Sequence, residues 1–189
     1  AEIDEITVPP RDPSAKQVYH LYIVRCQRRD ELQRFLCANG VDAKVHYPIP
    51  MHLQPAAVSL GYREGDFPMC EAIVKSVLSL PVHEYITPAQ QERNLAALEL
   101  HLGATEAMEH LGRAVRAKPD DIPSWMLHVR ARLGLQGFVD VGEALDDAKH
   151  VDRLAVEQNG KVKRLRALAH LRADQPGSAV LHAQRALKL

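Results

Sequence analysis

The pattern of apolar residues changes near residue 88, and this change is the feature that most constrains the fold. Before it, short runs of β-branched and aromatic residues alternate with helical runs, whereas after it one helical run follows another. The chain has 189 residues, 46% of them hydrophobic, which is enough apolar material for one ordinary core or two small ones. We therefore expect an α/β domain over residues 1–90 and an all-α segment over residues 91–189.

Strand and helix signals alternate along the first half. The stretch "VYHLYIVRC" is typical of a strand, and "RRDELQRFLCANG" predicts a covering helix that ends at Gly40. A second short strand is expected from "VDAKVHYP", and "FPMCEAIVKSVLSLP" should begin as a helix and finish extended. The result is a small α/β unit with a proline-rich loop after its second strand.

Small and apolar residues recur at regular spacing in the second half. The three sets are Ala107, Leu111 and Ala114; Val141, Leu145 and Ala148; and Ala179, Ala183 and Ala186. The first two are 34 residues apart, the length of a tetratricopeptide repeat, and the third follows after 38, with the extra residues expected in "VEQNGK". Small residues at such points let antiparallel helices approach closely. An unrelated helical bundle with chance alanines is the alternative.

The helix expected from "TPAQQERNLAALEL" belongs to both patterns. Thr87 is its expected N-cap and Pro88 its first residue. Residues 91–102 would close the α/β half and also serve as the first helix of the repeats. We therefore expect three helix pairs, the first of which continues directly from the α/β domain.

The first half contains a longer pattern that is specific to one family. Its parts, in order, are "VYHLYIVR", "RDELQRFLCANGVDAKVHYPIPMHLQPA" and "LGYREGDFPMCEAIVKSVLSLPVHEYITPAQQE". Together they resemble the C-terminal portion of the DegT/StrS family of pyridoxal-phosphate-dependent nucleotide-sugar aminotransferases, over about residues 9–95. The resemblance implies a type I aminotransferase fold, in which a large domain holds the cofactor and a smaller C-terminal domain closes the substrate cleft. This chain would supply the smaller domain, followed by the tetratricopeptide-like repeats.

The loop "KVHYPIPMHLQPA" is the candidate site. In the family that it resembles, this loop faces the cleft, which makes His46 and Tyr47 candidate substrate-binding residues, followed by His52 and Gln54. Imidazole, phenol and amide groups suit a nucleotide sugar, because they can bond to its hydroxyls and its diphosphate. A histidine beside prolines is more often a packing residue than a ligand. The residues alone therefore leave open whether His46 binds substrate or only packs in the fold.

The catalytic half of a transaminase is not recognisable in the sequence. Transamination requires a lysine that holds the pyridoxal phosphate, a carboxylate for the pyridine nitrogen and a phosphate site. Lys44 falls on the same strand face as His46, but nothing around it resembles the family's lysine segment. We assign no catalytic or cofactor-binding residue here, and expect pyridoxal phosphate in the full-length parent but none bound to this chain alone. The first residues, "AEIDEITVPPRDPSAKQ", look like the interior of a longer protein.

Composition limits the other possibilities. Twenty-four basic and 24 acidic residues give a formal net charge of zero, which argues against a nucleic-acid partner. The three cysteines have no spacing typical of a disulfide framework or a metal site, which favours a cytoplasmic location, and no apolar run suggests a membrane span. The family resemblance implies that the chain is the C-terminal part of a nucleotide-sugar aminotransferase, inactive alone because the large domain that binds the cofactor is absent. The alternative is an interaction module whose helical repeats bind a protein partner and which carries an enzyme remnant.

Overall fold

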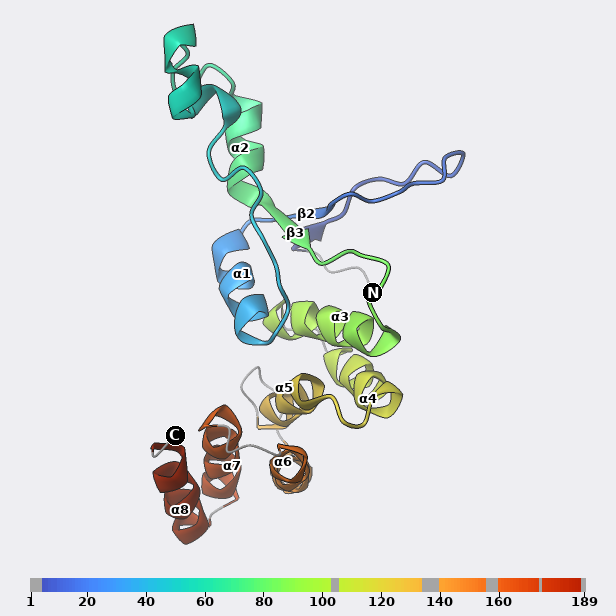
Figure 1. The fold of residues 1–189 in the computed structure, drawn as a ribbon, viewed down its shortest axis with the longest axis vertical. Coiled ribbons are helices and arrows are strands. Elements are labelled where there is room, and N and C mark those ends of the chain that lie inside the picture. Colours follow the sequence, from blue (N-terminus) through green and yellow to red (C-terminus); the bar gives the residue numbers. More distant parts are fainter. Residues whose placement is uncertain (1–4, 103–105, 134–139, 156–159, 174, 188–189) are drawn as a thin grey trace. The chain divides into compact units, whose positions relative to one another are not determined.

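A computed structural model describes residues 5–102, 106–133, 140–155, 160–173 and 175–187 (Figure 1). Its contacts divide the chain into two compact units, Ala1–Tyr85 and Ile86–Leu189. The helix that begins at Pro88 therefore groups with the second unit. The domain boundary expected at residue 90, and the role of this helix in joining the two halves, stay predictions.

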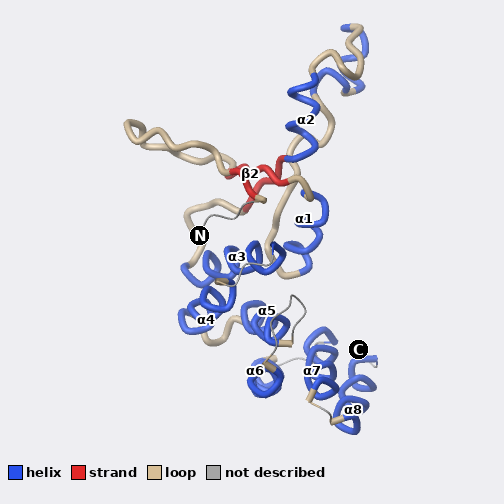
Figure 2. The backbone as a smooth tube through the Cα atoms, turned by 180° about the vertical axis from the view of Figure 1, so that it is seen from behind, coloured by secondary structure: helices blue, strands red, loops and turns tan. Residues whose placement is uncertain are grey.

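The first unit is built on a small antiparallel sheet with the strand order β1-β2-β3 (Figure 2). Its strands are β1 (Ile6–Thr7), β2 (Tyr22–Cys26) and β3 (Val77–Leu80). Val24 of β2 pairs with Leu78 of β3, and both side chains are buried. The register places alternate residues of β2 and β3 in one core.

Two helices complete this unit. Helix α1 (Arg29–Ala38) contributes Leu32 and Leu36, which are fully buried, and it ends before Gly40, whose φ of 79° lies in the left-handed region that glycine adopts easily. Helix α2 (Pro68–Ser76) runs directly into β3, as "FPMCEAIVKSVLSLP" predicts. The short 3₁₀ segments η1 (Met51–Leu53) and η2 (Pro55–Leu60) lie near the start of α2, away from the sheet (Figure 1).

The second strand expected at residues 41–48 is reduced to a single bridge. Lys44 pairs with Ser79 through two backbone hydrogen bonds, of 3.0 Å from the Lys44 N–H and 2.8 Å from the Ser79 N–H. The chain then leaves the extended conformation, because Tyr47 has a φ of 56° and Pro48 has no N–H to donate. The expectation of a full strand here is therefore wrong, because one bridge takes its place.

The described part of the second unit is helical. Its elements are α3 (Pro88–Leu102), α4 (Ala107–Ala117), α5 (Ile122–Arg132), α6 (Val141–Leu154), α7 (Gly160–Arg172) and α8 (Pro176–Leu187). Helix α3 packs on α4, α5 on α6, and α7 on α8 (Figure 1). At the start of α3, the Thr87 side chain accepts from the Gln90 N–H, and the Gln90 side chain accepts from the Thr87 N–H, which is a capping box.

The recurring small residues differ in burial. Seven of the nine are buried: Ala107, Leu111, Ala114, Leu145, Ala148, Ala179 and Ala186. Val141 is half-buried, and Ala183 is exposed. Most of the extra residues expected in "VEQNGK", residues 156–159, lie outside the described part of the chain. These observations fit paired helices, and the tetratricopeptide assignment itself stays a prediction. None of the helices that the structure describes is long and apolar enough to cross a bilayer.

Candidate functional site

The structure places the ring of His46 against β3. Its Nδ1 atom lies 2.8 Å from the hydroxyl oxygen of Ser79, which is 5% exposed. His46 is half-buried, and its Nε2 makes no hydrogen bond to any residue that the structure describes. The ring is therefore fixed through one nitrogen and leaves the other available.

Tyr47 is the exposed residue of the loop. Its side chain is 67% exposed, and its hydroxyl has no hydrogen-bond partner within the described residues. Its positive φ is rare for a bulky residue and costs conformational energy that the surrounding structure must offset. Strained backbone of this kind is found at ligand-binding positions more often than elsewhere.

His52 is tied to the start of α2. Its Nε2 lies 3.0 Å from Oε1 of Glu71, and the two side chains are only 8% and 11% exposed. The same oxygen accepts the backbone N–H of Gly65 at 2.9 Å. This hydrogen bond from Gly65, aided by His52, holds the pKa of the Glu71 carboxyl below its usual range. The ring also packs on Phe67, at 4.8 Å between centroids.

Gln54 uses its amide within the loop itself. Its Nε2 donates to the carbonyl of Ile49 at 3.2 Å and approaches the sulfur of Met51 at 3.4 Å. The four predicted residues thus belong to one loop but are used differently. His52 and Gln54 hold the loop in shape, whereas His46 and Tyr47 retain unused polar groups.

Sequence reasoning missed the two residues that fix the histidines. Ser79 and Glu71 lie 33 and 19 positions from their partners. The alternation of β3 marks Ser79 as a polar residue between two leucines, which is the only signal that pointed to it. Glu71 looks like an ordinary first-turn acid of a helix.

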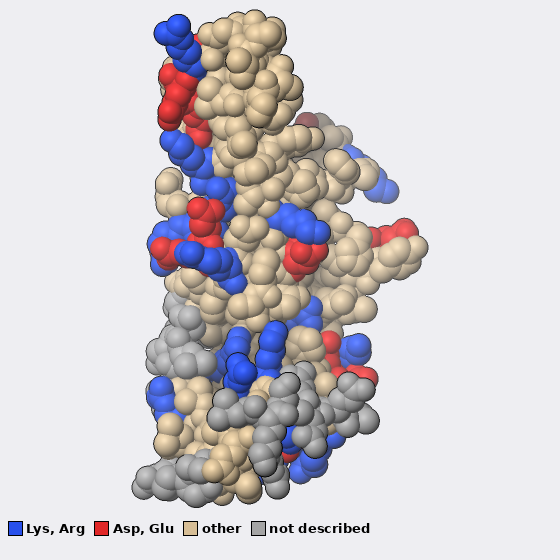
Figure 3. All heavy atoms as spheres, turned by 60° about the vertical axis from the view of Figure 1, so that its left-hand side comes forward, with Lys and Arg blue, Asp and Glu red and all other residues tan. Residues whose placement is uncertain are grey.

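Large apolar side chains are exposed along the same segment. They are Tyr47, Ile49, Met51, Val58, Leu60, Tyr62, Phe67, Met69 and Ile73. Figure 3 shows this end of the first unit as a largely uncharged surface with charged side chains along one edge. Many exposed apolar side chains on one segment are typical of a region that another protein surface covers.

A cavity of about 470 Å³ lies elsewhere on the first unit. It is lined by Glu5, Thr7, Arg25, Cys26, Gln27, Arg28 and Ser76, and none of the four candidate residues takes part. Both arginines of this lining are already engaged, because Arg28 forms a forked ion pair with Glu5 and Arg25 donates to Ser76. This lining contains no lysine, so it does not fit a pyridoxal phosphate held as a lysine adduct.

Lys44 does not fit that role either. Its ammonium group lies 2.8 Å from the Asp42 carboxylate, and the hydrogen bond and charge of Asp42 raise the pKa of the Lys44 amine. A lysine that forms a Schiff base needs a lowered pKa. Neither Lys44 nor the lining of this cavity therefore offers a lysine suited to hold the cofactor covalently.

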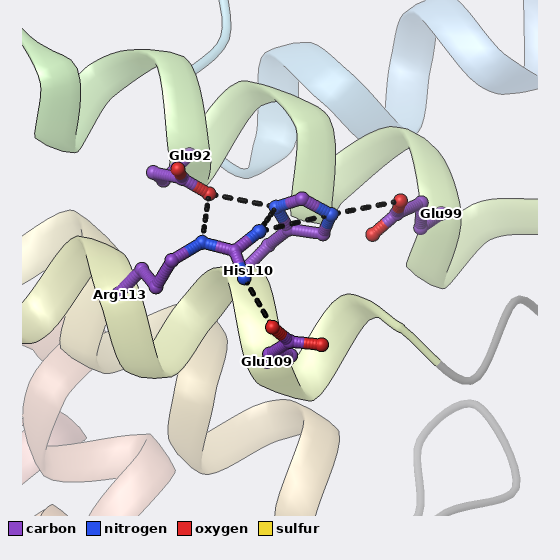
Figure 4. Close-up of polar contacts among 5 residues, drawn as sticks. All are labelled: Glu92, Glu99, Glu109, His110 and Arg113. Atoms are coloured by element: carbon purple, nitrogen blue, oxygen red, sulfur yellow. Dashed lines mark hydrogen bonds and ion pairs between the residues drawn. The ribbon is translucent and has the colours of Figure 1, made fainter. Parts of the chain in front are cut away.

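A second cluster of titratable groups lies between α3 and α4 of the second unit (Figure 4). The ring of His110 bridges two carboxylates of α3, with Nδ1 2.7 Å from Glu92 and Nε2 3.2 Å from Glu99. Arg113 donates to Glu92 at 3.0 Å and to the exposed Glu109 at 2.5 Å. Glu99 is completely buried, and this burial raises the pKa of its carboxyl. These contacts link two packed helices to each other, and we therefore interpret the cluster as a structural network.

Comparison with known proteins identifies the first half of the chain. The model of the DegT/DnrJ/EryC1/StrS aminotransferase family matches residues 1–99, just over half of the chain. The chain belongs to this family.

Its similarity to individual family members covers about half of the chain. The erythromycin biosynthesis sensory transduction protein EryC1 of Saccharopolyspora erythraea is 39% identical over 98 residues, which are 52% of this chain and 27% of EryC1. The dTDP-3-amino-3,4,6-trideoxy-alpha-D-glucose transaminase of Streptomyces venezuelae is 41% identical over 93 residues, 49% of this chain and 24% of that enzyme. The chain thus spans about a quarter of the length of these relatives.

A solved structure of the family shares the fold. The X-ray structure of S. venezuelae DesV in complex with a ketimine intermediate superimposes with a TM-score of 0.51 at 37% sequence identity. The match covers 54% of this chain and 28% of DesV. The expectation of an aminotransferase-type fold in the first half is confirmed by this likeness, whereas the comparisons do not extend to the tetratricopeptide assignment.

Proposed function

We propose that this chain supplies the substrate-binding part of a nucleotide-sugar aminotransferase. The observation that carries the proposal is the arrangement of His46 and Tyr47: a ring held through Nδ1 with Nε2 unused, next to an exposed phenol on a strained backbone. Relatives whose names state an activity on nucleotide-linked sugars are 29–41% identical over 81–93 residues. The family model matches residues 1–99, which contain this loop. The substrate class follows from that identity together with the polar groups of the loop.

The loop's own residues would bind and orient the substrate. Nε2 of His46 and the hydroxyl of Tyr47 can bond to sugar hydroxyls or to oxygens of the diphosphate. The tethers from Glu71 to His52 and from Gln54 to Ile49 hold the loop in a single shape before substrate arrives. Preorganised groups of this kind orient a substrate at a low entropic cost.

The cofactor chemistry would come from elsewhere in the parent enzyme. Pyridoxal phosphate, on which the family's enzymes depend, stabilises negative charge at the reacting carbon and accepts the amino group. Because Lys44 is paired with Asp42, we propose that this chain does not hold the cofactor by itself. The exposed apolar surface from Tyr47 to Ile73 would be covered by the part of the enzyme that does. No observation gives better support to the alternative, in which the helices α3 to α8 bind a protein partner.

A chimera tests this proposal. In the S. venezuelae dTDP-3-amino-3,4,6-trideoxy-alpha-D-glucose transaminase, the 93-residue matching segment is replaced by this full chain. Transamination of a dTDP-linked sugar, with the visible absorbance of bound pyridoxal phosphate, is the expected result. A chimera that binds the cofactor but aminates no nucleotide sugar contradicts the proposal.

A further inference from the structure

Ser79 makes two separate connections to the candidate loop. Its backbone exchanges both hydrogen bonds of an antiparallel bridge with Lys44, and its hydroxyl lies 2.8 Å from Nδ1 of His46. The residue itself is 5% exposed and lies in the middle of β3, where it pairs with Ile23. The bridge fixes the loop's backbone two residues before His46, and the hydroxyl then fixes the ring.

The contact also affects which ring nitrogen carries the proton. A neutral imidazole has one N–H, and the hydrogen bond made by one nitrogen determines the chemistry of the other. A serine hydroxyl can donate as well as accept. When Ser79 donates to Nδ1, the proton of His46 is held on Nε2, which becomes a donor.

A donor is what the proposed substrate requires at this position. The oxygens of a diphosphate accept hydrogen bonds and do not donate them. An Nε2 that lacked its proton would face these oxygens with a lone pair and would repel them. The direction of the Ser79 hydrogen bond therefore decides whether His46 attracts or repels the diphosphate.

We infer that Ser79 is a positioning residue, which orients the His46 ring through Nδ1 and holds the proton on Nε2 as the donor to the diphosphate of a nucleotide sugar. The part of this inference that concerns the substrate rests on the proposed function. The orientation and tautomer of the ring do not, and they can be measured on the chain without a substrate.

The test uses nitrogen-15 NMR of the histidine side chains in the full chain at a pH where His46 is neutral. In the unsubstituted protein, Nδ1 of His46 should have the chemical shift of an unprotonated nitrogen and Nε2 that of a protonated one. In Ser79→Ala, the ring should exchange between its two neutral tautomers, and both shifts should move towards the average of the protonated and unprotonated values. Ser79→Thr, which keeps a hydroxyl, should restore the shifts of the unsubstituted protein. A protonated Nδ1 in the unsubstituted protein overturns the inference, as does an unchanged spectrum in Ser79→Ala.

Ser76→Ala is the matched control. Ser76 is also a 5% exposed serine of the same segment, but its hydroxyl bonds to Arg25 and to carbonyls of α2. This variant should leave the shifts of His46 unchanged, and an equal effect would mean that Ser79 has no specific role.

The chimera then separates this inference from the proposed function. In it, Ser79→Ala should lower kcat/KM for the dTDP-sugar by about tenfold, the usual scale for a lost hydrogen bond to a charged group. The decrease should appear mainly in KM. If the NMR shifts respond as expected but the chimera does not aminate the sugar, the proposed function fails and the tautomer assignment stands. If the chimera is active but the shifts do not respond, only the role of Ser79 fails.

Discussion

Nε2 of His110 lies 3.2 Å from a carboxylate oxygen of Glu99, whose side chain is completely buried. Its other nitrogen bonds to Glu92, so one imidazole links two acids of the same helix to α4 (Figure 4). A buried carboxylate is costly unless a cation or a proton accompanies it. Packing of α3 on α4 therefore depends on the protonation of this cluster.

The free energy of unfolding should decrease as the pH rises above the normal range of a glutamic acid. Burial raises the pKa of Glu99 above its unfolded value, so the folded state binds more protons between the two values. Stability is therefore complete below the unfolded pKa, about 4.3, and is lost as the pH rises through the folded one. Replacing the group with an isosteric amide, Glu99→Gln, should remove up to about 1.4 kcal/mol per pH unit of this slope. Urea unfolding measured from pH 4 to 9 checks this.

Glu109→Gln is the control for that experiment. Glu109 belongs to the same cluster, but its side chain is 72% exposed and it pairs with Arg113 at the surface. Its removal should change stability by less than about 1 kcal/mol, with no change in the slope. Identical pH profiles for the unsubstituted protein and Glu99→Gln would show that the buried carboxyl does not titrate on unfolding.

Glu92 should have the opposite effect from Glu99: its contribution to the free energy of unfolding should be lost as the pH falls. Burial alone would raise the pKa of Glu92, but hydrogen bonds from His110 and Arg113 outweigh it and hold the pKa below the usual range. Stability from this group is present above its unfolded pKa and is lost as the pH falls through the folded value. Glu92→Gln should therefore flatten the acid side of the unfolding profile and leave the alkaline side unchanged. A loss confined to the alkaline side would contradict this assignment.

Packing of the helix pairs can be tested at the recurring alanines. Ala114 is 0% exposed, so Ala114→Trp should overpack its site and lower the free energy of unfolding by about 1–3 kcal/mol or more. Ala183 occupies a similar place in the sequence pattern but is exposed, and Ala183→Trp should be tolerated. Thermal unfolding of both variants measures the difference. Equal destabilisation by the two variants would contradict the prediction that burial of the alanine determines the cost of a bulky side chain.

The hydrogen bonds of Glu71 to His52 and Gly65 predict that a substitution at Glu71 changes backbone protection locally. Glu71→Gln weakens the hydrogen bonds from His52 and Gly65, because an amide oxygen is a poorer acceptor than a carboxylate. Hydrogen exchange at the Gly65 amide should become faster, by about tenfold, while the amides of β2 remain protected. The neighbouring exposed acid provides the control, since Glu64→Gln should change neither rate. Unchanged exchange at Gly65 in Glu71→Gln would exclude the tether.

Local sequence patterns predicted the helices better than they predicted Ser79 and Glu71, the residues that hold the two histidines of the loop. The ends of α1, the change from α2 to β3 and the cap at Thr87 all follow from neighbouring residues. The stretch "GDFP" also predicts Asp66 as the N-cap of α2, and this prediction is wrong. The Asp66 carboxylate accepts from the Arg63 N–H instead and closes the preceding turn.

The candidate site was only half visible in the sequence. The motif containing His46 and Tyr47 can be recognised directly, since its residues are adjacent. The contact between His46 and Ser79 depends on the register of Lys44 against β3, which is a tertiary property. The positive φ of Tyr47 is equally invisible, because neither Tyr nor the following proline signals it.

The central claim is that the loop containing His46 and Tyr47 binds the substrate. Its most direct test is the turnover of the chimera when either residue is replaced by alanine. His46→Ala and, separately, Tyr47→Ala should each lower kcat/KM for the dTDP-sugar by more than about tenfold, with the absorbance of bound pyridoxal phosphate unchanged. His20→Ala, an exposed histidine just before β2, should have no effect. Unchanged kinetics in both the His46 and Tyr47 variants would contradict a substrate-binding role for this loop.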